Sequence, residues 1–147
     1  MPSFAKSDEQ YTTFEKRYDA DGTVWMQAYA HGDLTALTPY KIIANEYGNI
    51  TAALADDTKY YYVGVPAAAV SSGDIAWLQI GGYCADVVTP SLSVTAGHSL
   101  LLYDGAVADG GADFSGVAGE FAVNVSTTTS ATAHDVILIP ERMIGTT

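Results

Sequence analysis

Residues 73–82 read GDIAWLQIGG, residues 94–102 read VTAGHSLLL and residues 135–139 read DVILI. In each stretch a glycine or aspartate turn signal adjoins a short run of aliphatic and aromatic residues, the pattern of a β-strand bounded by tight turns. The glycine pair at 81–82 separates the run at 75–80 from a second run at 83–88, and it predicts a hairpin. These stretches predict an all-β fold, built as a small antiparallel β-barrel or sandwich with an N-terminal arm.

Other segments extend this strand pattern along the chain. Four of them are rich in β-branched and aromatic residues, which favour strands: residues 24–30, 40–44, 60–65 and 117–125. We expect residues 1–39 to form the arm and first strand, and residues 40–147 to form the β-barrel domain. A chain of 147 residues is long enough for one domain with a single core.

The charge composition restricts the partners. The chain has 17 acidic and 6 basic residues, which gives a formal net charge of −11. Nucleic-acid binding depends on cations that neutralise phosphates, and an anionic membrane surface repels the same charge, so we expect neither partner. The first residues lack the pattern of a secretory signal, and the single cysteine allows no internal disulfide, so we expect a protein made and used without export.

The first 24 residues differ from the rest of the chain. They carry 8 charged side chains, whereas the remaining 123 residues carry 15. They also contain four aromatic residues, Phe4, Tyr11, Phe14 and Tyr18, of which the last three are spaced by three and four. Two interpretations stay open: an arm that docks on a partner, or one short helix folded onto its own barrel.

The residues that could carry catalysis or bind a metal are few. His31, His98 and His134 stand beside turn residues, and none has the paired spacing to another ligand that zinc sites use. Cys84 and His98 could form a nucleophile pair, but a lone cysteine in a predicted strand is more typical of a buried apolar residue. We therefore expect no enzyme activity, no metal and no cofactor.

The acidic residues near glycines offer a weak case for calcium. Asp104, Asp109, Asp113 and Glu120 could supply oxygen ligands, but they lack the alternating register and final glutamate of calcium loops. We expect a solvated acidic loop instead. The glycine patterns that cradle phosphates are also absent from the sequence, so nucleotide binding has no support.

Aromatic residues give the best indication of a binding surface. Consecutive residues of a strand point to opposite faces, so Tyr60, Tyr61 and Tyr62 cannot all enter one core. Tyrosine is favoured at protein interfaces because its ring gives a large, rigid contact area. The candidate partner-binding residues are Phe4, Tyr11, Phe14, Tyr18, Tyr60, Tyr61 and Tyr62.

The strand and turn pattern from about residue 59 to 140 resembles that of the small all-β proteins that decorate and stabilise tailed-bacteriophage capsids. The resemblance lies in the stretches quoted first and in the runs YVGV at 62–65 and GVAG at 116–119. It implies a structural virion protein, made in the host cytoplasm, that binds the major capsid protein on the outer capsid surface. It also implies a homo-oligomer, a dimer or trimer, that reinforces joints between capsomers.

The N-terminal arm departs from this family pattern, because it is longer, charged and aromatic. The mode of attachment is therefore open. The alternative function is a carbohydrate- or receptor-binding β module of a phage tail or a similar assembly, which would use exposed tyrosine and tryptophan rings.

Overall fold

The computed structural model describes residues 16–44, 50–53, 60–89, 94–103, 106–111, 120–126, 133–139 and 144–145. This part of the chain is all β. Its strands are β1 (Lys16–Tyr18), β2 (Val24–Ala30), β3 (Tyr40–Ala44), β4 (Ile50–Ala53), β5 (Tyr60–Pro66), β6 (Ile75–Val88), β7 (Ser99–Tyr103), β8 (Ala106–Gly111), β9 (Glu120–Asn124), β10 (Ala133–Leu138) and β11 (Ile144–Gly145). Within the described residues, no helix has the length and apolar character needed to cross a membrane.

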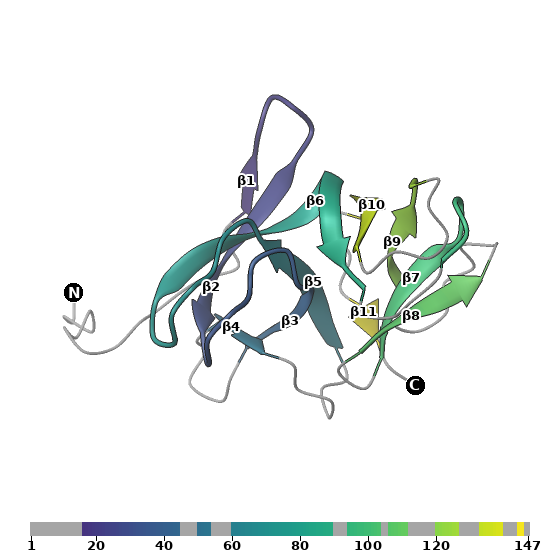
Figure 1. Cartoon of the computed structure of the whole chain (residues 1–147). Helices are drawn as coiled ribbons and strands as arrows, with labels where there is room; N and C mark the ends of the chain where they lie inside the picture. The colour runs from purple at the N-terminus through teal and green to yellow at the C-terminus, as the bar shows by residue number, and fades with distance from the viewer. Residues whose placement is uncertain are drawn as a thin grey trace, which may run out of the picture.

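The strands pair in the order β1-β2-β4-β3-β5-β6-β10-β9-β7-β8, with β11 on β5 (Figure 1). The pairs are antiparallel, apart from the parallel pair β2–β4. A further pairing joins β2 directly to β6, although β4, β3 and β5 separate these two strands in the order above. Strands β10, β9, β7 and β8 continue from β6 to an open edge. The sheet as a whole does not close into a barrel. The predicted all-β class is confirmed, in its sandwich form.

The long strand β6 belongs to both halves of the molecule. Residues 75–81 pair with β2, with one register shift, in what we call the first lobe, together with β1, β3, β4 and β5. Residues 82–88 pair with β10 in what we call the second lobe, which also contains β7, β8 and β9. Figure 1 shows the two groups of strands on either side of β6.

The hairpin predicted at the glycine pair is wrong, because residues 75–88 form one continuous strand. Gly82 has a φ of +85°, and a Cβ atom there would lie 2.6 Å from the carbonyl oxygen of Gly22. The pairing with β2 shifts register beside it, between Val24 and Trp25. Gly82 therefore lies at a bulge and at a close approach of two backbones, and not in a turn. All three of these settings favour glycine, so the sequence alone does not distinguish them.

Two hydrophobic clusters fill the two lobes. The cluster of the first lobe consists of Val24, Met26, Ala28, Ala30, Leu34, Tyr40, Ile42, Leu78 and Ile80. The cluster of the second lobe consists of Val63, Val65, Cys84, Val87, Val94, Leu100, Phe121, Ala122, Val136 and Leu138. Because Val63 and Val65 lie on β5, a strand of the first lobe supplies part of the second core.

Several predicted strands are confirmed with small changes of boundary. The segments at 24–30 and 40–44 form β2 and β3 with the predicted limits, and the segment at 60–65 forms β5. Four strands were not predicted: β1, β4, β8 and β11. The β8 strand includes the aspartate and glycines at 109–111, residue types that favour turns. The division into residues 1–39 and 40–147 stays a prediction, although β2 pairs across it with β6.

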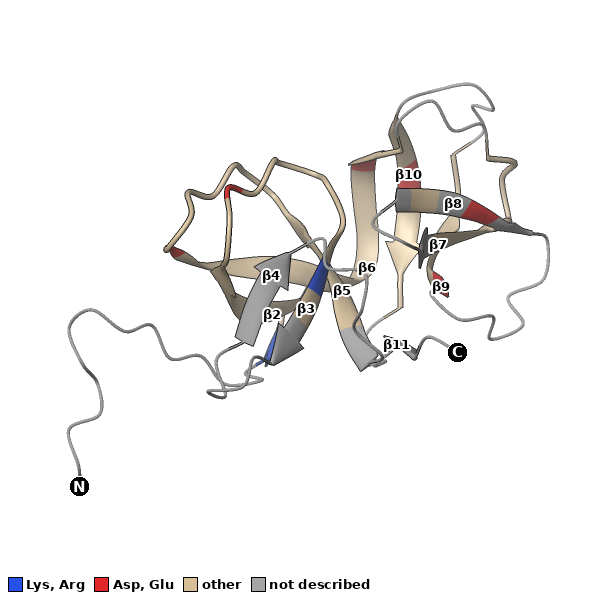
Figure 2. Ribbon diagram, turned by 90° about the horizontal axis from the view of Figure 1, so that it is seen from below, with Lys and Arg blue, Asp and Glu red and all other residues tan. Residues whose placement is uncertain are grey.

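The charged side chains are distributed unevenly. The described residues include three basic ones, Lys16, Arg17 and Lys41, and all of them belong to the first lobe. Lys41 is buried. In Figure 2 the basic positions accordingly lie among β1–β5, whereas acidic positions occur in both lobes.

Candidate functional site

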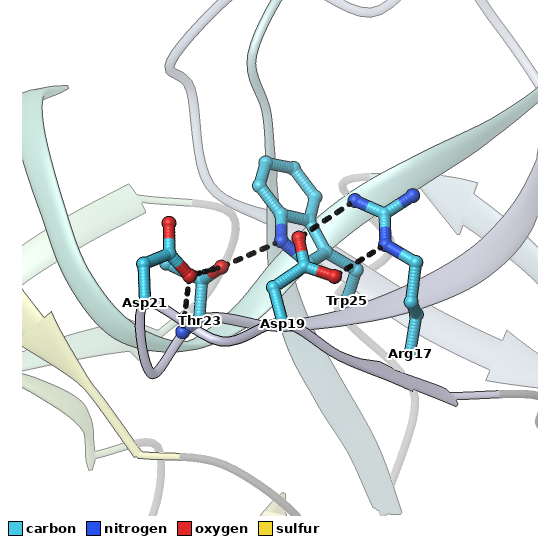
Figure 3. Close-up of polar contacts among 5 residues, drawn as sticks. All are labelled: Arg17, Asp19, Asp21, Thr23 and Trp25. Atoms are coloured by element: carbon cyan, nitrogen blue, oxygen red, sulfur yellow. Dashed lines mark hydrogen bonds and ion pairs between the residues drawn. The ribbon is translucent and has the colours of Figure 1, made fainter.

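The hairpin of β1 and β2 projects from the first lobe and carries a polar network at its tip (Figure 1, Figure 3). The chain turns through Gly22, whose φ is +88°, and the Asp19 backbone N–H donates to the Thr23 carbonyl over 3.0 Å. The Thr23 backbone N–H and hydroxyl both donate to Asp21 Oδ1, over 3.0 and 2.6 Å. The Trp25 indole N–H then donates to the Thr23 hydroxyl over 2.9 Å.

This network affects the protonation of Asp21. The hydrogen bond from the Thr23 hydroxyl, followed by that from the Thr23 backbone, lowers the pKa of Asp21 below its ordinary value. Each of these bonds favours the ionised carboxylate, which is an acceptor only. The tip of the hairpin is therefore negatively charged at neutral pH.

At the base of the same hairpin, two cations lie over aromatic rings. The Arg17 guanidinium carbon is 5.2 Å from the ring centroid of Trp25 and 5.2 Å from that of Trp77 on β6. Its Nε and Nη2 atoms donate to the Asp19 carboxylate over 2.9 and 3.2 Å. Lys16 Nζ lies 5.1 Å from the ring centroid of Tyr62. Such contacts each stabilise an exposed site by about 0.5–1 kcal/mol.

We call Lys16, Arg17, Trp25, Tyr62 and Trp77 the hairpin surface. Alternation along β2 places the Trp25 ring on the outward side, opposite the buried Val24 and Met26. The two tryptophans lie in the runs at 24–30 and 75–80, which the sequence predicts as strands. The contribution of Arg17 was missed, because no local pattern links it to a ring sixty positions away.

The predicted residues of the arm are only partly described. Phe4, Tyr11 and Phe14 lie outside the described residues. Tyr18 ends β1 and is 61% exposed. Lys16–Tyr18 is a strand, so at these positions the arm does not continue as the short helix that was one of its two interpretations.

The tyrosine triplet lies on β5. The backbones of Tyr60 and Tyr61 pair with Gly145 and Ile144 of β11. Tyr62 is half-buried, packs against the core of the first lobe and lies beneath Lys16. The structure thus brings Tyr62 to the strand that carries Tyr18. Their role in partner binding stays a prediction.

The candidate catalytic residues are held in other contacts. His98 Nδ1 lies 3.1 Å from an Asp109 carboxylate oxygen, and His134 Nδ1 shares a 2.6 Å hydrogen bond with the Thr89 hydroxyl. Burial, followed by the charge of Asp135, raises the pKa of Cys84 to about 11. This environment opposes thiolate formation. Across the ranges described above, no three His, Cys, Asp or Glu side chains are placed to hold a metal ion.

Glu120 departs from the expected solvated loop. Its side chain is fully buried at the start of β9, where the Ser99 hydroxyl of β7 donates to Oε2 over 2.6 Å. In the pairing of β7 with β9, Glu120 lies opposite Leu101, two residues along β7 from Ser99. Glu120 therefore belongs to a buried strand and not to a solvated loop. Asp104 and Asp113 lie outside the described residues.

Comparison of the chain with models of protein families and with curated protein sequences finds no match. Comparison with solved structures finds the N base of the head fiber gp8.5 of bacteriophage phi29, with a TM-score of 0.52 and 16% sequence identity. The match covers 80% of this chain and 94% of that chain. A likeness at this identity concerns the fold, and the fold of this chain is similar to that of a head fiber base.

Proposed function

We propose that this protein is a structural component of a tailed-bacteriophage head, which attaches to the outer surface of the shell and stabilises contacts between capsomers. One observation carries the proposal: the fold is similar to that of the N base of a phage head fiber over nearly the whole of that base. Because folds host many functions, the fold supports this proposal only together with the features of the chain itself.

Those features fit a protein that binds rather than catalyses. Burial and a neighbouring carboxylate keep Cys84 protonated, and His98 is engaged by Asp109. The net charge of −11 disfavours nucleic acid as a partner. We propose the major capsid protein as the main partner and a dimer or trimer of this chain as the attached unit.

The experiment uses heads of the phage whose genome encodes the chain, purified from a mutant that lacks it. The purified protein is added, the heads are sedimented, and the bound protein is measured against concentration and located by immunogold electron microscopy. Saturable binding with label on the outer surface, and heads that resist heat better, are expected. Protein that stays in the supernatant at all concentrations contradicts the proposal. Light scattering of the free protein gives its oligomeric state.

The alternative is a carbohydrate-binding module, favoured by the two half-buried tryptophans on the outward face of the first lobe. A sugar ring would have to stack on these rings, but Arg17 covers both and is itself held by Asp19. A glycan array tests the alternative. Binding that is abolished by Trp77→Ala would favour it over attachment to the shell.

A further inference from the structure

The outward face of the second lobe carries apolar side chains where polar ones are expected. Tyr83 on β6 lies directly opposite Ile137 on β10, and Ile137 lies directly opposite Val123 on β9. Tyr83 is 53% exposed and Ile137 is 39% exposed. Directly opposite residues on one face have Cβ atoms about 4.5–5.5 Å apart, so the three side chains form a continuous row across three strands.

The row is extended by Val125, which directly follows β9, is 44% exposed and donates its backbone N–H to the Asp135 carbonyl of β10 over 2.9 Å. The opposite side of these strands is already filled, because Cys84, Val136 and Ala122 are buried in the second core. The exposed row is therefore not needed for that core. We call Tyr83, Val123, Val125 and Ile137 the apolar row.

Two carboxylates border the apolar row. Asp135 lies at a register shift of β10, and its Oδ1 accepts the Asp86 backbone N–H of β6 over 3.0 Å. The described residues of the second lobe include four acidic side chains, of Asp86, Asp109, Glu120 and Asp135, and none of Lys or Arg. Figure 2 shows the acidic positions of β6 and β10 on neighbouring strands.

The electrostatic environment of Tyr83 agrees with this distribution. Partial burial, followed by the charge of Asp135, raises the pKa of Tyr83, and Asp86 acts in the same direction. A negative field at the ring disfavours a further negative charge there. A protein surface that covers the apolar row would lie in the negative electrostatic field of Asp135 and Asp86.

We infer that the apolar row is the surface by which the protein docks on the head shell, against an apolar patch of the shell protein bordered by lysine or arginine. Exposed apolar rows with a polar border are typical of protein interfaces. A second copy of this chain is the weaker occupant, because its acidic border would be repelled by the border of the first. The inference rests on the proposed function, since it names the surface that attaches to the shell.

The test is the head-binding experiment with a double variant, Tyr83→Thr and Ile137→Thr. Threonine keeps the strand preference while it removes most of the apolar area. We expect binding to purified heads to weaken at least about tenfold, with an unchanged melting temperature.

The chain offers a matched control in the first lobe. Tyr29 on β2 lies directly opposite Ile75 on β6, so Tyr29→Thr with Ile75→Thr removes the same pair of side chains from another sheet face. This control variant is expected to bind heads like the wild type. A second test variant, Asp86→Asn with Asp135→Asn, is expected to bind several-fold more weakly, and its binding is expected to depend less on salt.

The outcomes separate the inference from the function it rests on. Failure of the wild type to bind heads overturns both. Wild-type binding that the Tyr83 and Ile137 substitutions leave unchanged overturns the inference alone. Self-association of the wild type that these substitutions abolish shows that a second copy covers the apolar row, and it also overturns the inference.

Discussion

At the residue scale, the Thr23 hydroxyl connects the turn of the hairpin to its tryptophan. It donates to Asp21 and accepts from the Trp25 indole, so one oxygen supports both an acidic turn and an aromatic ring. This explains how an exposed carboxylate has a shifted pKa. The cause is a directed hydrogen bond rather than a nearby cation, because Arg17 contributes least among the causes.

The first prediction concerns this hydroxyl. In Thr23→Val, which keeps the shape of the side chain and removes its donor, the pKa of Asp21 is expected to rise toward its ordinary value of 3.8. In the wild type the pKa is lowered, so the stabilisation from this contact is present above pH 3.8 and is lost as the pH falls below it. Nuclear magnetic resonance titration of the carboxyl carbon measures both values. Equal values in the two proteins would contradict the assignment.

The second prediction concerns the single cysteine. Its pKa is raised from 9.0 to about 11, first by burial and then by Asp135, so the thiolate is scarce at pH 8. Alkylation of Cys84 is expected to be slow in the folded protein and to accelerate until about pH 11. In urea, the rate is expected to level off above about pH 9. A folded protein whose rate levels off near pH 9 would show that the thiol is exposed.

At the element scale, the residues of β6 were correctly predicted to be in strands, but the connection between the two predicted strands was wrong. Residues 75–80 and 83–88 were each predicted as strands from their apolar residues, and both lie in β6. The glycine pair between them has the same local signature whether the chain reverses or passes another backbone closely. The deciding partner is Gly22, sixty residues earlier, and nothing in the local sequence indicates it.

The same limit explains the strands and contacts that were missed. The β8 strand runs through residues that normally signal a turn, and its pairing with the apolar β7 holds it extended. Glu120 is buried at the start of β9, where the Ser99 hydroxyl of β7 donates to its carboxylate, and the local sequence does not indicate this partner. By contrast, the run of aliphatic and aromatic residues at 24–30 was sufficient to predict the limits of β2, whose side chains alternate between buried and half-buried positions.

The third prediction tests the role of the second glycine in β6. Gly82→Ala has to accommodate both a φ of +85° and a Cβ atom 2.6 Å from the Gly22 carbonyl oxygen, so we expect destabilisation well above 2 kcal/mol. Gly73→Ala is the control, because Gly73 has a φ of +93° and open space around the added atom. It is expected to cost about 1–2 kcal/mol. Urea unfolding measures both, and equal losses would refute the close approach.

At the scale of the whole molecule, the two lobes share a strand and part of a core. The β6 strand pairs with β2 in one lobe and with β10 in the other, and Val63 and Val65 of β5 reach the core of the second lobe. A lobe that unfolded alone would expose the shared strand and these two valines. The structure therefore favours one cooperative unfolding transition.

The last prediction uses the positions of the two tryptophans. The chain contains two, Trp25 and Trp77, and both lie in the first lobe, so their fluorescence reports the unfolding of that lobe. Leu138→Ala removes a fully buried side chain from the other core and is expected to destabilise the protein by about 2–5 kcal/mol. If the lobes unfold together, this change shifts the fluorescence midpoint in urea as far as the midpoint from circular dichroism.

Thr95→Ala, at an exposed position of the second lobe, is the control and is expected to shift neither midpoint. A fluorescence midpoint that stays fixed while the circular dichroism curve splits in two would show that the lobes unfold independently, despite the strand they share.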